Sequence, residues 1–548
     1  MIFEPPSRAP VPPTDVLSYT FSDPSYDRTV PIYVDAHEPS RSICHDQARR
    51  IVRQLIAGLH AWGVRKGDCV NIHSFNDIYY PMLVLAIVGI GGIFTGSNPA
   101  YTLLELRHHL NTAQVRFIIT ESELFGPIRT AARDLNISLS HVRIFNARRE
   151  TIPEGTVSWT DLFEHGEKDW ERIHDGSIAA QTTAVRLFSS GTTGLPKATE
   201  ITHTNLIAQH ELVFELHRRP YWVVSRVVPT PLFHAAAVPS THFGSLKAGH
   251  TNYIMRRFDL LLLLETVEKY HVTDLAVVPP VVIAIIMSPL SYKRRYLRSI
   301  RTSSIGAAPI DQGTQRRLQA LLGEGAPCTQ VWGMTETSCI ATTLPYPEQD
   351  YTGSVGRLIP NLEAKLIDHA GNNISAYNVR GEICVRGPTV TPGYFNNSVA
   401  NKASFDEDGW FHTGDIGYCE AGTEKWYIVD REKESIKVRG FQVAPLELEA
   451  VLISHPLIVD AAVIGIRHLV PGTELPQAYV VRRPGDGDRL TEEIVKSYLA
   501  QRLASYKALT GGVRFVDAIP KNASGKILKR LLREQSQKEI EDGWRPRL

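Results

Sequence analysis

The stretch LFSSGTTGLPKATEITHTN, residues 187–205, constrains the fold most, because it contains a long run with almost nothing that a core could bury. Hydroxyl residues and glycines fill positions 189–194, and Pro196 and Lys197 follow them. Glycine is costly inside helices and strands, and serine and threonine compete for backbone hydrogen bonds. The run therefore predicts a loop after an apolar strand, which is either a flexible linker or a holder for a ligand.

The composition of this loop suits an anion. Backbone N–H groups next to glycines can form an anion-binding nest, and the hydroxyls and Lys197 add donors and a positive charge. Nucleotide phosphates are a chemically reasonable ligand. The loop is not a Walker A motif, because that motif needs Gly-Lys-Ser/Thr, whereas here Pro196 precedes the lysine and Ala198 follows it.

Overall composition excludes several classes of protein. The chain has 548 residues, 43% of them hydrophobic and 21% charged, as in a globular protein with a large core. The 59 Lys and Arg balance 58 Asp and Glu, which gives no electrostatic reason to bind nucleic acid. Six scattered cysteines without a CxxC pair predict neither a disulfide scaffold nor a zinc site, and fit a reducing compartment.

The uncharged run at residues 80–96 is short for a membrane helix and contains four glycines. We expect a buried helix and strand there, and no membrane span. Elsewhere, segments with helical periodicity alternate with short apolar runs such as VRFIITE (115–121) and DLAVVPP (274–280). One example is an apolar stripe from Ile51 to Trp62 that Gly63 ends. This alternation predicts an α/β fold with largely parallel sheets.

The character of the sequence changes near residue 430. KWYIVD (425–430), DAAVIGI (460–466) and QAYVV (477–481) read as strands of a smaller unit, and residues 492–506 as an amphipathic helix. We therefore predict a large N-terminal domain, residues 1–430, and a small C-terminal domain, residues 431–548.

Other segments also suit nucleotide chemistry. In QVWGMTET (330–337), the carboxylate of Glu336 could hold Mg²⁺ against phosphates. In HTGD (412–415), Asp415 follows a glycine and suits the two hydroxyls of a ribose. PKNASGKILKR (520–530) places Lys526 on a glycine-containing loop. Taken alone, each segment favours a surface turn over a nucleotide site.

Together and in this order, these motifs resemble the adenylate-forming, or AMP-binding, superfamily, and most closely its 4-coumarate–CoA ligase-like group of acyl- and aryl-CoA synthetases. SSGTTGLPK and PKNASGK, more than 300 residues apart, are specific, and VRGFQVAPLELE adds to them. The resemblance covers roughly residues 42–530. It implies a multi-subdomain N-terminal α/β domain with a small, mobile C-terminal α+β lid. It also implies a reaction in which a carboxylic acid and ATP give acyl-adenylate and pyrophosphate, after which CoA gives acyl-CoA and AMP.

The resemblance also implies a set of site residues. The catalytic residues are Lys526, His234, Thr335, Glu336 and Lys437, and Glu336 also supports Mg²⁺. The phosphate loop comprises Ser189, Ser190, Gly191, Thr192, Thr193, Gly194 and Lys197. The other residues expected to bind ATP or CoA are Ala307, Gln330, Trp332, Gly333, Thr335, Asp415, Arg431, Lys433, Gln442, Arg257, Arg439 and Gly440. The acyl substrate is expected to contact His234, Ala236, Gly306, Gln330 and Met334.

Some residues depart from the family pattern. Trp332 stands where relatives usually have tyrosine, and its ring is expected to stack on or flank the adenine. Ala198 and Glu200 are unusual beside the phosphate loop. Ala236 falls where hydroxycinnamate ligases carry a tyrosine that binds the substrate hydroxyl. This weakens an assignment to 4-coumarate and leaves room for a bulkier or apolar acid.

Alternative functions remain open at this point. The chain could load a carrier-protein thiol instead of CoA, or it could be a catalytically silent nucleotide-binding relative. The silent relative is disfavoured because Lys197, Glu336, Asp415 and Lys526 are all present. We expect ATP, Mg²⁺, CoA and a small carboxylic acid as ligands, with an acyltransferase or carrier protein as a possible partner. We expect a cytoplasmic location, with a peroxisomal one as the alternative, because Pro546-Arg547-Leu548 loosely resembles a peroxisomal address.

Overall fold

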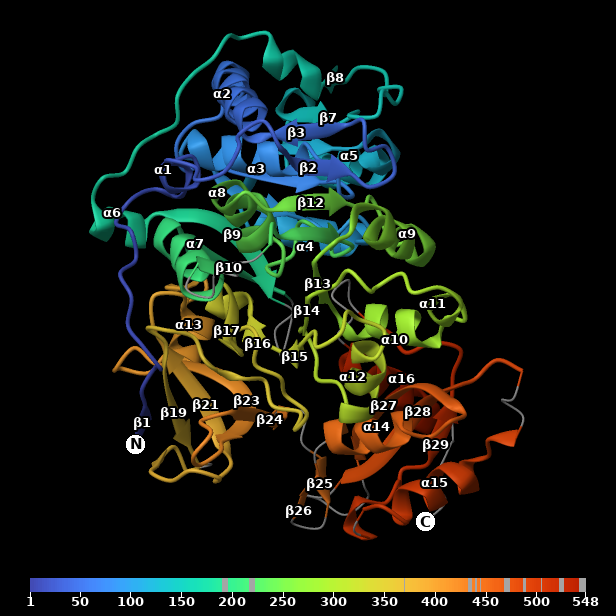
Figure 1. Ribbon diagram of the computed structural model, residues 1–548. Coiled ribbons are helices and arrows are strands. Elements are labelled where there is room, and N and C mark those ends of the chain that lie inside the picture. The colour runs from blue at the N-terminus through green and yellow to red at the C-terminus, as the bar shows by residue number, and fades with distance from the viewer. Residues whose placement is uncertain are drawn as a thin grey trace.

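The computed structural model describes residues 1–189, 196–215, 222–368, 370–431, 436–438, 441–443, 445–467, 474–485, 489–503, 505–521 and 527–541. Figure 1 shows two stacked α/β layers in the first half of the chain. An antiparallel sheet lies below them, and the C-terminal elements lie to one side of it. The expected mixed α/β architecture is therefore confirmed.

The first sheet contains the strands that come directly before and after residues 190–195. Its strand order is β22-β10-β9-β5-β4-β6-β7-β8. The bounds are β22 (Gly393–Tyr394), β10 (Lys197–Thr202), β9 (Thr183–Ser189), β5 (Ile93–Gly96), β4 (Cys69–His73), β6 (Val115–Thr120), β7 (Val142–Ile144) and β8 (Val157–Ser158). The strands from β9 to β8 are parallel, whereas β10 and β22 are antiparallel additions at one edge.

The second sheet has the order β15-β14-β13-β11-β12-β2-β3 and is parallel except for its last pair. The bounds are β15 (Cys328–Gln330), β14 (Thr302–Ile305), β13 (Asp274–Val277), β11 (Ser225–Val228), β12 (Thr251–Ile254), β2 (Pro31–Asp35) and β3 (Ser42–Cys44). The strands expected at VRFIITE and DLAVVPP are present as β6 and β13.

Helices pack between and around these sheets. Their bounds are α1 (Val16–Thr20), α2 (His45–Trp62), α3 (Tyr80–Gly89), α4 (Leu103–Thr112), α5 (Phe125–Asp134), α6 (Gly176–Gln181), α7 (His203–Gln209), α8 (Ser245–Ala248), α9 (Leu260–Tyr270), α10 (Pro279–Met287), α11 (Leu290–Lys293), α12 (Gln312–Gln319) and α13 (Ser398–Ser404). Short 3₁₀ and π segments are η1 (Ser122–Leu124), η2 (Leu139–His141), η3 (Trp159–Phe163), η4 (His210–Glu215), η5 (Val238–Gly244), η6 (Thr335–Thr337) and η8 (Ser505–Lys507).

The main core joins the first two sheets through α1, α2, α3 and α7. The run at residues 80–96 forms the wholly buried α3 and β5, as predicted. Helix α2 presents the predicted apolar stripe and ends at Gly63, whose φ of 104° is a left-handed cap. Within the described part of the chain, no helix has the length and apolar character needed to cross a membrane.

The antiparallel sheet has the order β1-β19-β21-β23-β24, with β20 on the side of β19. The bounds are β1 (Ile2–Phe3), β19 (Glu363–Ile367), β20 (Asn373–Ile374), β21 (Gly381–Arg386), β23 (Phe411–Cys419) and β24 (Trp426–Arg431). A separate small sheet contains β16 (Trp332–Met334), β17 (Cys339–Thr343) and β18 (Arg357–Leu358). Placing KWYIVD in the smaller C-terminal unit was wrong, because β24 pairs along its length with β23.

The C-terminal elements build a core of their own. They are β25 (Ile436–Val438), β26 (Phe441–Val443), α14 (Pro445–Ile453), β27 (Ile458–Arg467), β28 (Glu474–Arg482), α15 (Glu492–Ala500), β29 (Val513–Phe515) and α16 (Lys529–Glu541). Strand β28 pairs with both β27 and β29, while α14 and α16 pack on β27. The predicted amphipathic helix is present as α15, in which Val495 and Leu499 are buried and Ile494 is exposed. The proposed boundary after Asp430 stays a prediction.

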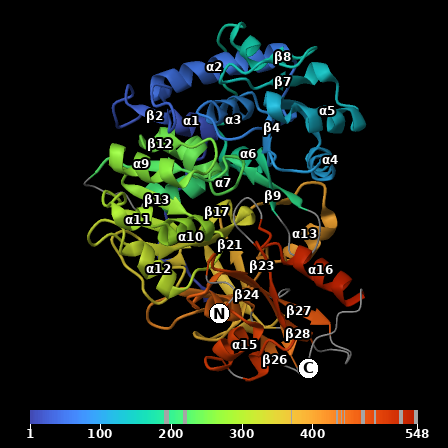
Figure 2. The same ribbon diagram turned by 90° about the vertical axis from the view of Figure 1, so that its right-hand side faces the viewer.

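The C-terminal unit lies beside α10 and α12 in both views (Figures 1 and 2). A groove of about 610 Å³ is lined by Met287 and Arg317 from one unit and by Val459 and Arg483 from the other, and Arg483 Nη2 lies 4.0 Å from Met287 Sδ. The buried apolar clusters of the two units are separate.

We predict that Gly58→Ala destabilises the N-terminal domain. A methyl group there would lie 2.0 Å from the carbonyl oxygen of Leu162, so α2 and η3 would have to separate. Alanine normally favours a helix by about 1 kcal/mol, but overpacking costs about 1–3 kcal/mol. Thermal unfolding should show a lower midpoint for Gly58→Ala. Gly126→Ala in α5 is the control and should not lower the midpoint, because an added Cβ there would meet no atom within 4 Å beyond the chain neighbours and the backbone of its own helix.

Candidate active site

The strand that the sequence predicts before the phosphate loop is present, and a second strand follows the loop. Strand β9 ends at Ser189, strand β10 begins at Lys197, and these two residues are paired across the strands. Ser189 is buried, and its Oγ has no hydrogen-bond partner among the residues that the structure describes. The intervening predicted loop residues, 190–194, lie outside the described residues. The strand pair thus brings a hydroxyl and an ammonium group to the same edge of the sheet.

Glu336 lies beside this edge. Its carboxylate Oε1 accepts a hydrogen bond of 2.8 Å from the hydroxyl of Tyr394, and the ring of Tyr394 lies 4.1 Å from Lys197 Nζ. Glu336 and Thr335 are buried, with 7% and 9% of their surface exposed. Two predicted site residues are therefore connected through Tyr394, a residue that sequence reasoning missed.

A buried amide fixes the turn after Glu336. Ser338 and Cys339 have φ values of 58° and 136°, conformations that cost non-glycine residues energy. Gln209, fully buried at the end of α7, donates from Nε2 to the carbonyl oxygens of Thr337 (3.0 Å) and Ile340 (2.6 Å). The N–H of Ile340 donates to Gln209 Oε1 at 3.3 Å. Gln209 thus stabilises the strained turn, and no motif in the sequence indicated this role.

Trp332 and Asp415 meet directly. The indole Nε1 donates to Asp415 Oδ2 at 2.8 Å, and both side chains are buried. Gly414, whose φ is +69°, forms the turn before Asp415. The predicted adenine neighbour and the predicted ribose ligand are therefore brought together, and the indole orients the carboxylate.

The predicted acyl-side loop is held by Gln330. Its Oε1 accepts from the N–H of Ile310 at 3.0 Å, and its Nε2 donates to Ile310 O and Gln315 Oε1, each at 3.1 Å. Gly306 and Ala307 lie in this loop, and Ala307 is exposed with a φ of +73°. The contacts give Gln330 a loop-holding role, whereas its predicted contact with a ligand stays a prediction.

Gly333 and Met334 lie in β16, the strand that follows β15. A side chain at Gly333 would collide with the backbone of Cys339, since an added Cβ would lie 1.7 Å from the carbonyl oxygen. Only glycine fits between these strands. Met334 is partly buried beside Thr335, and its N–H donates to Thr337 Oγ1 at 3.0 Å.

His234 has a defined tautomer. The N–H of Ala236 donates to His234 Nδ1 at 3.2 Å, and since an amide N–H can only donate, Nδ1 accepts. The neutral ring therefore carries its proton on Nε2. Burial within the protein lowers the pKa of His234 to about 4, which keeps the ring neutral near pH 7. His234 can donate one hydrogen bond from Nε2 but cannot supply a positive charge.

Several predicted residues are not brought into this cluster. The guanidinium of Arg257 lies 3.8 Å from the Phe75 ring centroid, and its Nη2 is 3.2 Å from Glu123 Oε1. Its predicted contact with CoA stays a prediction. The backbones of Arg431, Lys437 and Gln442 lie in β24, β25 and β26, but their side chains are outside the described atoms. Outside the described residues lie Lys433, Arg439, Gly440, Lys526 and the tail Pro546-Arg547-Leu548.

One cluster resembles a metal site. Among the described residues, potential ligand atoms of Glu382, Cys384 and His412 lie within 4.8 Å of one another. However, Glu382 already accepts from Gly414 N at 2.9 Å and lies 3.1 Å from His412 Nδ1. The hydrogen bond to Glu382 raises the pKa of His412. We interpret the cluster as an ion pair that fixes the turn before Asp415.

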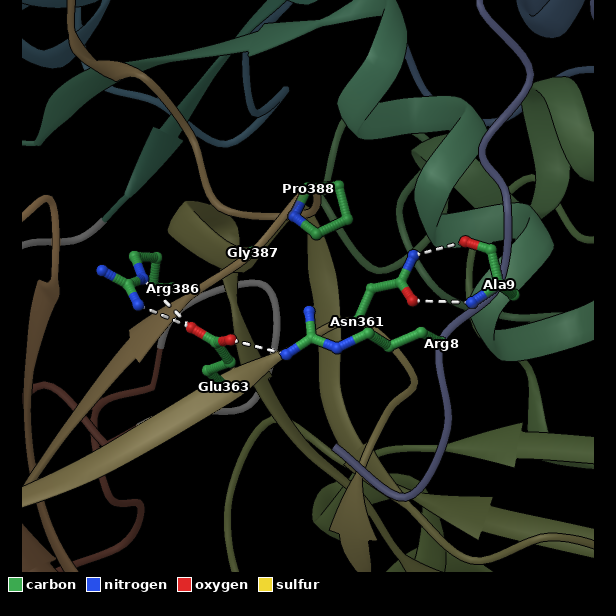
Figure 3. Close-up of a pocket in the computed structure, with 7 residues that line it drawn as sticks. All are labelled: Arg8, Ala9, Asn361, Glu363, Arg386, Gly387 and Pro388. Atoms are coloured by element: carbon green, nitrogen blue, oxygen red, sulfur yellow. Dashed lines mark hydrogen bonds and ion pairs between the residues drawn. The ribbon is translucent and has the colours of Figure 1, made fainter. Parts of the chain in front are cut away.

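A surface groove of about 420 Å³ contains none of the predicted site residues. Figure 3 shows Arg8 and Arg386 converging on Glu363 from opposite sides, with Nη2–oxygen distances of 2.8 Å each. Asn361 pairs with the backbone of Ala9 through both its oxygen and its nitrogen. These contacts attach the N-terminal segment to the antiparallel sheet.

Comparison with known proteins decides the family. The family model described as AMP-binding enzyme matches residues 22–395. A second, described as AMP-binding enzyme C-terminal domain, matches residues 447–526. The chain belongs to the AMP-binding enzyme family. The resemblance predicted from the motifs is therefore confirmed.

Relatives of similar length are CoA ligases. The phenylacetyl-CoA ligase epaB of Aspergillus niger is 50% identical over 543 residues, 98% of this chain and 100% of that protein. The 4-coumarate–CoA ligase 3 of Arabidopsis thaliana is 36% identical over 505 residues, 90% of this chain and 86% of the relative. The crystal structure of ATP-bound MatB from Rhodopseudomonas palustris matches with a TM-score of 0.83 at 26% identity, covering 96% of this chain and 99% of that one.

The chain is thus an acyl-CoA ligase of the AMP-binding enzyme family, in which ATP and CoA are substrates. The fold class predicted from the sequence, a large N-terminal domain with a small C-terminal one, is confirmed by these matches.

We predict that Trp332→Phe raises KM for ATP about tenfold, because Asp415 loses a hydrogen bond worth about 1.5 kcal/mol. KM for 2′-deoxy-ATP should change less, since it lacks one hydroxyl that Asp415 would bind. Steady-state kinetics with both nucleotides test this. Trp159→Phe is a matched control, because Trp159 is buried and its indole N–H has no partner in the described part of the chain. Equal effects on both nucleotides would contradict an orienting role for Trp332.

We further predict a pH dependence at His412. Its pKa is raised in the folded protein, so its contribution to stability is complete below about pH 6.5 and is lost as pH rises through the raised value. His412→Gln should therefore lower the midpoint of thermal unfolding more at pH 6 than at pH 9. His109, whose pKa burial lowers to about 3, should show the opposite trend when replaced by glutamine. A pH-independent effect at His412 would be inconsistent with the ion pair.

Proposed function

We propose that this ligase carries out both half-reactions at the cluster around Glu336, Lys197 and Asp415. In the first, a carboxylate oxygen attacks the α-phosphorus of ATP, the bond to the bridging oxygen breaks, and pyrophosphate leaves. In the second, the sulfur of CoA attacks the acyl carbonyl, AMP leaves with the bonding electrons, and the thiol proton is lost. The observation that supports this most is the contact chain from Lys197 through Tyr394 to Glu336.

The residues present fit a magnesium ion at Glu336. Mg²⁺ prefers oxygen ligands and usually binds one or two carboxylates together with substrate phosphates. Glu336 offers a buried carboxylate that is held by Tyr394, whose ring also contacts Lys197. Bound there, the ion would neutralise phosphate charge. Thr335 is proposed to contact the α-phosphate, Lys197 the outer phosphates and Asp415 the ribose.

His234 is proposed to position the acid. Its Nε2–H can donate to a carboxylate or acyl oxygen without adding charge, because Nδ1 is occupied by the N–H of Ala236. The lysines of the C-terminal domain are proposed to act in turn. Lys526 would stabilise the charge that develops on the α-phosphate, and Lys437 with Arg439 would serve thioester formation after the domain rotates about Lys433.

We propose that the acid has an apolar acyl chain without a 4-hydroxyl group. Residues 235–237 are all alanine, and Ala236 is exposed. These three side chains offer no hydrogen-bond partner for a phenol hydroxyl. An unpaired buried hydroxyl costs about 1–3 kcal/mol. One of the 50% identical relatives, epaB of Aspergillus niger, is named a phenylacetyl-CoA ligase, and phenylacetate fits this description. CoA is the proposed acceptor, in a cytoplasmic setting that suits the free cysteines among the described residues.

Lys526→Ala tests whether Lys526 acts in the first half-reaction and not in the second. We expect pyrophosphate release to fall about 100-fold or more, equivalent to about 3 kcal/mol at the barrier, because the charge on the α-phosphate develops only in the first half-reaction. Supplied with synthetic phenylacetyl-adenylate and CoA, the variant should form thioester at close to the normal rate. Lys538→Ala on the exposed face of α16 is the control. Equal loss in both assays would refute the assignment.

A further inference from the structure

We propose that Tyr394 is a positioning residue that orients the Glu336 carboxylate and the Lys197 ammonium relative to each other. The inference rests on the proposed functions of Glu336 and Lys197. One side chain makes both contacts. Its hydroxyl donates to Glu336 Oε1 at 2.8 Å, and its ring centroid lies 4.1 Å from Lys197 Nζ.

The backbone of Tyr394 is fixed independently of any substrate. Strand β22 pairs with β10, which places Tyr394 opposite Thr199. Asn401 holds the same residue from the other side, since Asn401 Oδ1 accepts from Tyr394 N at 2.7 Å and Nδ2 donates to Tyr394 O at 3.0 Å. Tyr394 is only 4% exposed. A residue held this firmly can orient its neighbours before ATP binds.

The chemistry of the phenol suits this role. The phenol hydroxyl is the donor in the contact with Glu336, because an ionised carboxylate can only accept a hydrogen bond. The ring face attracts a cation, an interaction that reaches about 2 kcal/mol when desolvated. The hydroxyl therefore acts on the metal-binding carboxylate, and the ring acts on the phosphate-loop lysine.

These two actions can be separated by substitution. Tyr394→Phe removes the hydrogen bond and keeps the ring, whereas Tyr394→Leu removes both. Losing an outer partner of a metal ligand typically costs 10- to 100-fold in metal affinity or activity. For Tyr394→Phe we expect the half-saturating free Mg²⁺ in pyrophosphate release to rise about tenfold. KM for ATP at saturating Mg²⁺ should change less than twofold.

Tyr394→Leu should raise KM for ATP as well, because the Lys197 ammonium group loses its contact with the aromatic ring of residue 394. In the Lys197→Met background, Tyr394→Leu and Tyr394→Phe should give the same KM for ATP, since no ammonium group is left for the ring to attract. If the two substitutions still differ there by as much as they do with Lys197 present, the part of the proposal that concerns Lys197 is overturned.

Controls separate positioning from folding. Tyr479→Phe removes another buried hydroxyl donor, which bonds Leu532 O at 3.2 Å in the C-terminal domain. This variant should lower the unfolding midpoint without changing the Mg²⁺ requirement. Glu336→Gln is the reference variant, because it removes the carboxylate that is proposed to bind Mg²⁺. A normal Mg²⁺ requirement in Glu336→Gln would refute the proposed function of Glu336. A changed requirement in Glu336→Gln combined with a normal one in Tyr394→Phe would overturn this inference alone.

Discussion

The buried carboxylate of Glu336 is the group on which the rest of the site depends. Burying a carboxylate is costly unless hydrogen bonds or an opposite charge compensate it. Here the Tyr394 hydroxyl supplies the hydrogen bond, and Lys197 lies over the ring of the same side chain. The N–H of Thr391 also fixes the backbone, donating to Glu336 O at 2.8 Å. The carboxylate is thus held in a defined place, and its oxygens can bind a cation there.

Sheet topology explains why the site residues gather at one place. Ser189 ends β9, Gly306 follows β14, and Gln330 ends β15, so each comes from the carboxyl end of a strand in a largely parallel sheet. Ligands of open α/β sheets bind at these ends. The antiparallel additions β10 and β22 then contribute Lys197 and Tyr394 from the edge of the first sheet. The site is therefore assembled from segments that are far apart in the sequence.

Much of the fold could be predicted because local patterns determine it. The stripe of α2, its Gly63 cap and the buried pair α3 and β5 follow from periodicity and glycine positions. Tyr394 could not be found this way, since its strand is very short and pairs with the distant β10. Gln209 reads as an ordinary polar helix residue, and only tertiary structure shows that it is buried. KWYIVD was misplaced because strand pairing, not composition, decides to which sheet a strand belongs.

The charges of the described site suggest why a second domain is needed. Lys197 and Glu336 carry opposite charges and both contact Tyr394, and His234 is neutral near pH 7 because burial lowers its pKa to about 4. The described groups therefore supply little net positive charge, whereas ATP and a carboxylate bring several negative charges together. Besides the magnesium ion proposed at Glu336, the cations that the family resemblance implies are Lys437, Arg439 and Lys526, and all three follow residue 430. We infer that the N-terminal site binds and orients the substrates, and that the C-terminal domain brings the charge that each half-reaction requires.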